Sequence, residues 1–109
     1  MPTVSVRSIV EWSSHPGREK RFVYEERITL WNASSMDEAI ELAERESNDY
    51  ANSKGFRDLG LFQAFWMFSE LGDGPQGVEV FSLLRESDLP AEAYLDAFFD
   101  EGSEHQRKG

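Results

Sequence analysis

The chain has 109 residues, the length of one ordinary domain with a single hydrophobic core. Its 21 acidic and 11 basic residues give a formal net charge of -10, which disfavours binding to nucleic-acid backbones and to anionic membrane surfaces. The sequence has no cysteine, no long apolar run and no export-signal pattern, so it predicts a cytoplasmic protein without disulfides, thiolate metal sites or membrane spans.

Two predicted strands form the first part of the chain. Residues 4–12 alternate between apolar and polar side chains, which is typical of a strand with one covered face. A polar segment with a Pro-Gly pair, residues 13–19, predicts a turn into a second strand over residues 21–31. Glu26 interrupts the apolar face of this second strand with a carboxylate. The other members of that face are Phe22, Tyr24, Ile28 and Leu30.

A helix is predicted over residues 36–51. Ser35 and Glu38 form a capping box at its start, because the hydroxyl accepts from the backbone of Glu38 while the carboxylate reaches back. Small residues line one stripe of this helix, so it can approach a sheet closely. Gly55 is the expected stop, because glycine adopts the left-handed conformation without a steric penalty.

The second half of the chain predicts two further strands, a helix and a tail. Residues 58–70 are apolar in both alternating positions, so both faces of this third strand are expected to be covered. A glycine-rich turn leads to a fourth strand over residues 78–84, and we expect these two strands to form a hairpin. Asp88 and Pro90 begin a final helix, whereas residues 101–109 form a disordered polar tail.

Together these elements predict one α+β domain over residues 1–100 with the order ββαββα. We expect a mostly antiparallel four-stranded sheet with both helices on one face. The strand order stays open, because a β-grasp arrangement and a sheet with a helical crossover between two hairpins both satisfy the pattern.

Two segments of the chain resemble a known bacterial family. They are residues 24–28, Tyr-Glu-Glu-Arg-Ile, and residues 79–89, Glu-Val-Phe-Ser-Leu-Leu-Arg-Glu-Ser-Asp-Leu. With the helix between them, they are similar to short single-domain bacterial proteins that form a domain family of unknown function. The resemblance covers residues 10–99 and implies a stand-alone bacterial cytosolic domain. It implies no catalytic residue.

Glu26 is the sharpest candidate for chemistry, because a carboxylate on an apolar face must be paired or protonated. The alternative is a structural role, in which Glu26 pairs with Arg7, Arg27 or Arg85, or lies at a bulge. If the second and fourth strands are neighbours, a polar cluster forms around it, either as a pocket or as a cross-strand network that fixes register. The members of that cluster are Glu25, Glu26, Arg27, Glu79, Ser82 and Arg85.

The sequence offers no pattern for a cofactor or a metal ion. His15 and His105 lie in polar segments and are not spaced with carboxylates as metal ligands would be. The chain contains no serine-nucleophile elbow, phosphate-binding glycine loop or dinucleotide fingerprint. We therefore assign no catalytic residue, no metal ligand and no cofactor.

The third strand predicts an interface. Phe62, Trp66 and Phe68 share one side of it, opposite to a second apolar row, and two helices on one face would leave this side uncovered. A second copy of the chain would bury the aromatic side, as interfaces rich in Trp, Phe and Met do. The alternative is local coverage by the last helix or by Trp12 and Trp31.

These features favour a small acidic protein-interaction module that forms a homodimer. One variant is an immunity-type or inhibitor-type protein whose acidic surface binds a basic protein partner. The alternative is a small ligand-binding protein or enzyme with a polar pocket around Glu26, Ser82 and Arg85. No nucleic acid and no membrane is expected as a partner.

Overall fold

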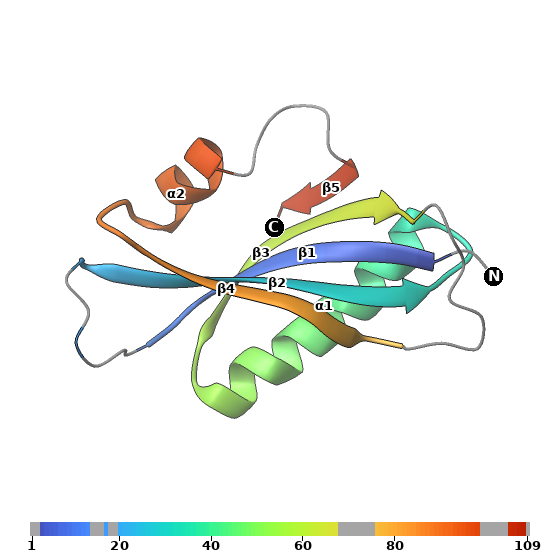
Figure 1. Cartoon of the computed structure of the whole chain (residues 1–109), viewed down its shortest axis with the longest axis horizontal. Helices are drawn as coiled ribbons and strands as arrows, with labels where there is room; N and C mark the ends of the chain where they lie inside the picture. Colours follow the sequence, from blue (N-terminus) through green and yellow to red (C-terminus); the bar gives the residue numbers. More distant parts are fainter. Residues whose placement is uncertain (1–2, 14–16, 18–19, 68–75, 99–104, 109) are drawn as a thin grey trace.

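The computed structural model describes residues 3–13, 17, 20–67, 76–98 and 105–108. These residues form five strands and two helices (Figure 1). The elements in chain order are β1 (Thr3–Glu11), β2 (Phe22–Asn32), α1 (Met36–Lys54), β3 (Arg57–Trp66), β4 (Val78–Ser87), α2 (Ala91–Phe98) and β5 (His105–Lys108). The predicted α+β class, the order ββαββα and the antiparallel pairing of the four predicted strands are confirmed.

The strands form one sheet in the order β4-β2-β1-β3-β5, and every neighbouring pair is antiparallel. β1 and β2 form a hairpin, and β1 lies at the centre of the sheet. The predicted hairpin of the third and fourth strands is wrong, because β2 and β1 separate β4 from β3. The chain instead returns after β3 to the far side of β2, where β4 begins.

α1 covers one face of the sheet because the sequence caps it and gives it a small apolar stripe. Its N-cap is Ser35, whose side chain accepts from the backbone nitrogen of Glu38 at 3.0 Å. Gly55 ends it in the left-handed conformation with φ 73°, as predicted, although the helix extends to Lys54. Its buried side chains pack on Val4, Val6, Trp31, Phe62 and Ala64.

α2 packs on the opposite face, so the prediction that both helices share one face is wrong. Tyr94 and Leu95 of α2 join Ile9, Tyr24 and Leu61 in a second core cluster. Ile9 lies an odd number of residues from Val4 and Val6, so alternation along β1 turns it to the other face. Figure 1 shows the two helices on opposite sides of the strands. Each face therefore has its own small core.

The described residues His105–Lys108 form a strand, so the predicted disorder does not hold for this part of residues 101–109. Within it, β5 pairs with β3 in a register that aligns Leu61 with Lys108 and Ala64 with His105. Strand pairing uses backbone groups, so a segment without apolar side chains can extend a sheet. In the part of the chain that the structure describes, neither helix combines the length and apolar character that a membrane crossing needs.

Candidate functional site

The predicted polar cluster is divided between the two faces of the sheet. β2 and β4 are neighbours, as the cluster required, and Arg27 lies opposite Ser82 in their register. Successive residues of a strand point to opposite faces, so Glu25 and Arg27 point to the α1 side while Glu26 points away from it. Two groups result. Glu25, Arg27, Glu79 and Ser82 lie on the α1 side, whereas Glu26 and Arg85 lie on the α2 side.

Glu25 is the buried acceptor of a network beneath α1, with only 4% of its surface exposed. One carboxylate oxygen accepts from Trp12 Nε1 at 3.0 Å and from the Tyr50 hydroxyl at 2.7 Å. The other oxygen accepts from the Ser82 hydroxyl. These three donors satisfy a buried carboxylate whose desolvation would otherwise be unfavourable.

Arg27 is the buried cation of the same network and is 3% exposed. Its guanidinium donates to Glu79 at 2.6 Å and to both oxygens of Glu46, at 2.9 and 2.7 Å. Its face lies 3.7 Å from the centre of the Tyr50 ring. Burial opposes its charged form, but the hydrogen bonds that Arg27 donates to Glu46 and Glu79 outweigh burial and raise the pKa of Arg27. The contacts of Arg27 with Glu46 and Glu79 therefore join β2, α1 and β4.

Glu26 lies beside Arg7, one of the partners named in the structural interpretation of this carboxylate. Its carboxylate lies 3.6 Å from Arg7 on the neighbouring strand β1. Arg7 also donates to Gln63 at 2.9 Å, which links β2, β1 and β3 across the second face. Arg85 donates to the Tyr94 hydroxyl at 3.2 Å and so belongs to the docking site of α2. A pocket around Glu26, Ser82 and Arg85 does not form, because Ser82 lies on the other face.

Sequence reasoning missed three members of the buried network, Trp12, Glu46 and Tyr50. Tyr50 lies near the end of α1, and the sequence gave no sign that its hydroxyl binds Glu25. Trp12 lies just past β1, and its ring stacks on Phe56 at 4.8 Å. A buried carboxylate on β2 needs donors, but the sequence does not show which distant residues supply them.

Two tyrosines with raised pKa values should make the stability of the fold depend on pH under alkaline conditions. Burial raises the pKa of Tyr24 from 10.0 to about 12, and burial together with the Glu25 hydrogen bond does the same for Tyr50. Because the pKa is higher in the folded state, the contribution of these tyrosines to the free energy of unfolding is fully present below pH 10. It is lost as the pH rises towards 12. We expect the urea midpoint of unfolding to fall as the pH rises from 10 to 12. In Tyr50→Phe the midpoint should fall less steeply with pH, because one of the two tyrosines no longer ionises. An unchanged slope in Tyr50→Phe would contradict this assignment.

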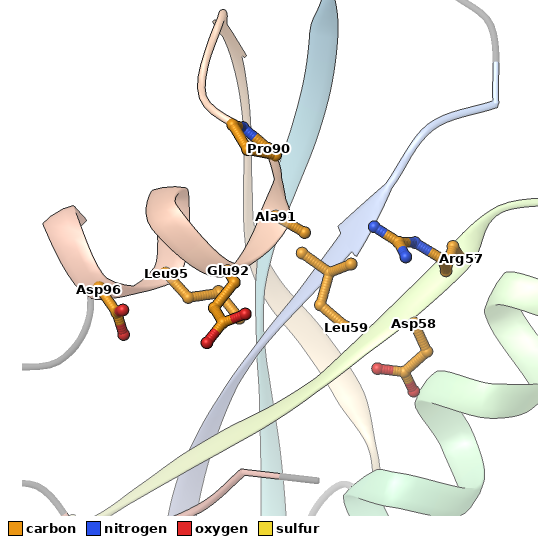
Figure 2. A pocket seen from close by; sticks show the side chains of 8 residues that line it. All are labelled: Arg57, Asp58, Leu59, Pro90, Ala91, Glu92, Leu95 and Asp96. Atoms are coloured by element: carbon orange, nitrogen blue, oxygen red, sulfur yellow. The ribbon is translucent and has the colours of Figure 1, made fainter.

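A cavity of about 680 Å³ lies where the start of β3 meets α2. Figure 2 shows Leu59 of β3 and Ala91 of α2 pointing toward each other across it. Its polar lining has mixed charge, and Arg57 is already paired with Glu11 at 2.6 Å. Its other lining residues are Asp58, Pro90, Glu92, Leu95 and Asp96. Within the described ranges, no group of His, Cys, Asp or Glu side chains is arranged to hold a metal ion.

The predicted interface residues do not form one exposed row. Phe62 is 3% exposed because it packs under α1, so its assignment to an interface is wrong. Trp66, at the end of β3, is 48% exposed, and Phe68 lies outside the described residues. Trp31 and the last helix were the expected local coverage of this strand. Trp31 is buried on the α1 side of the sheet, and α2 covers one end of the opposite face.

The main exposed apolar surface instead lies on β4. Five of its side chains are between 39% and 53% exposed, and we call them the β4 surface: Val78, Val80, Phe81, Leu83 and Leu84. β4 is at the edge of the sheet, with β2 on one side and no described strand on the other. The sequence did carry a signal for this surface, because residues 80–84 are apolar in both alternating positions around one serine.

Comparisons of the chain with protein-family models, with curated proteins and with solved structures give no match. The resemblance to a bacterial family therefore stays a prediction, and the function must be argued from the geometry of the chain itself.

Proposed function

We propose that this protein is an interaction module that self-associates through the β4 surface. The observation that carries the proposal is the exposure of five apolar side chains on one edge strand, each between 39% and 53% exposed. An edge strand with exposed apolar side chains favours association with another chain, because its outward backbone groups are open to pairing.

The charge of the chain supports the same surface. The net charge of -10 opposes self-association in general, because like charges repel at close approach. The stretch from Val80 to Leu84 has no charged residue, so two copies can approach there without placing charges in contact. Elsewhere the outer side of α1 is strongly acidic, beginning with Asp37 and Glu38 in its first turn.

Phe81→Glu is expected to convert a dimer into a monomer. The substitution places a carboxylate at the centre of the apolar contact, where burial without a partner is unfavourable by several kcal/mol, about 3 or more. Phe81 is 44% exposed, so the folded monomer tolerates the change. Light scattering coupled to gel filtration should give the wild type twice its chain mass of 12.5 kDa and the variant the chain mass alone.

Trp66→Glu is the matched control. Trp66 is an exposed aromatic residue of similar exposure, but it lies on β3, separated from β4 by β2 and β1. We expect Trp66→Glu to remain a dimer. A dimer that survives Phe81→Glu, or a wild-type protein that stays monomeric at high concentration, would remove the β4 surface as the site of association.

A further inference from the structure

We infer that the second copy joins edge to edge along β4, in antiparallel orientation, so that one continuous sheet runs through both copies. This inference rests on the proposed self-association and specifies its geometry. The occupant is a second copy of this chain, the contact is strand to strand, and the backbone of each β4 supplies hydrogen bonds to the other.

The distribution of exposed side chains on β4 favours an edge contact over a face contact. Phe81 lies opposite Ile28 in the register with β2, on the α2 side, whereas Leu84 lies opposite Glu25, on the α1 side. Both are exposed, at 44% and 40%. Stacking a second sheet onto one face would cover only one of them. A partner strand beside β4 contacts the margins of both faces and also satisfies the outward backbone groups of the edge.

An antiparallel edge can pair with an identical edge about a twofold axis, so the partner needs no other component. An axis at Ser82 sets Phe81 opposite the partner's Leu83 and Val80 opposite the partner's Leu84. Directly opposite residues of antiparallel strands share a face, so both pairings bring apolar side chains together. The pairing is thus apolar on both sides of the central Ser82 pair.

The apolar side chains select this register. Because directly opposite residues share a face, the nearest other positions of the axis are at Phe81 and at Leu83. An axis at Phe81 would set Val80 opposite the partner's Ser82. An axis at Leu83 would set Phe81 opposite the partner's Arg85. Each alternative therefore forms fewer apolar pairs than the axis at Ser82.

The acidic helices do not oppose this arrangement. α1 packs mainly over β3 and β1 and so lies away from the β4 edge. In the paired sheet five strand spacings separate β1 from its copy, a distance of about 24 Å. The screening length in physiological salt is about 8 Å, so repulsion between the two helices is largely screened.

Disulfide trapping tests the geometry directly, because the chain contains no cysteine of its own. Phe81→Cys and Leu83→Cys are prepared as separate proteins, one of them isotopically labelled, and are mixed in a glutathione redox buffer. In the proposed register residue 81 faces residue 83 of the other copy at a Cα separation of about 5 Å, whereas two copies of the same variant meet diagonally at about 7–8 Å. The mixed disulfide should exceed either like-with-like disulfide about tenfold.

Phe65→Cys is the control for a face contact. Phe65 is 41% exposed on β3 and lies on the same face as Phe81 but away from the edge. A dimer in which Phe65→Cys copies cross-link, or in which the mixed disulfide of residues 81 and 83 is not favoured, would overturn edge pairing while self-association stands. A monomer by light scattering would overturn self-association itself, so the two failures are distinguishable.

Discussion

Glu25→Ala is expected to lower the free energy of unfolding by about 3–5 kcal/mol. The substitution removes the acceptor of three hydrogen bonds, from Trp12, Tyr50 and Ser82, in a site where Glu25 is almost fully buried. Hydrogen bonds to a charged acceptor contribute about 1.5–3 kcal/mol each, so the loss of three at once should be large. Urea denaturation followed by circular dichroism measures the change.

The neighbouring residue Glu26 supplies a matched control. Glu26→Ala removes a carboxylate from the same strand, but its only described ion pair is the 3.6 Å contact with Arg7, and Arg7 keeps Gln63 as a partner. The expected loss is about 1 kcal/mol. Equal losses for the two variants would show that the network beneath α1 has no special role in stability.

Tyr94→Ala is expected to destabilise the fold by about 3–5 kcal/mol and to release α2 from the sheet. Tyr94 is 1% exposed, and its ring stacks on Tyr24 with the ring centres 4.0 Å apart. α2 has eight residues, too few to be stable without tertiary contacts. Removing the ring leaves Leu95 as the main buried anchor of this helix. Hydrogen exchange should then show the amides of Ala91–Phe98 unprotected.

Tyr94→Phe separates the ring from its hydroxyl. The hydroxyl accepts from Arg85 at 3.2 Å, and the loss of this bond should destabilise the fold by about 1 kcal/mol. The helix should stay docked, with its exchange protection retained. If Tyr94→Phe releases α2 as completely as Tyr94→Ala does, the polar contact and not the aromatic stack holds the helix.

Local features of the fold could be predicted from the sequence because they depend on neighbouring residues. Ser35 and Gly55 marked both ends of α1, since caps act within one turn. The alternation in residues 4–12 and 21–31 gave the first hairpin and showed which side chains share a face. The predicted polar cluster required the second and fourth strands to be neighbours, which the sequence did not predict. In the structure β2 and β4 are neighbours.

The identity of the buried carboxylate could not be predicted. Alternation shows that Glu25 and Glu26 point to opposite faces, but it does not show which face a helix covers more closely. Glu26 was singled out because its strand neighbours are apolar, yet Glu25 is the more deeply buried because α1 lies over its face. Burial is set by elements distant in sequence, and the period of one strand contains no information about them.

The strand order and the strand β5 could not be predicted from the alternation of apolar residues, because both depend on pairing between distant parts of the chain. The turn between the third and fourth strands suggested a hairpin, yet β4 pairs with β2, which lies far earlier in the chain. β5 has no apolar residue, and its pairing uses only backbone groups that every sequence possesses. Phe62 failed as an interface residue because its side of β3 is the side that α1 covers.

The central position of β1 has a consequence for synthesis of the protein. β1 is synthesised before its two neighbours in the sheet, and one of them, β3, follows only after the whole of α1 has been made. Until then the edge of β1 that later pairs with β3 is open, and the apolar face of the β1–β2 hairpin is exposed to water. A lone two-stranded hairpin is marginally stable. Translation speed through residues 33–66 should therefore influence how much newly made chain aggregates, even though the finished protein buries that edge.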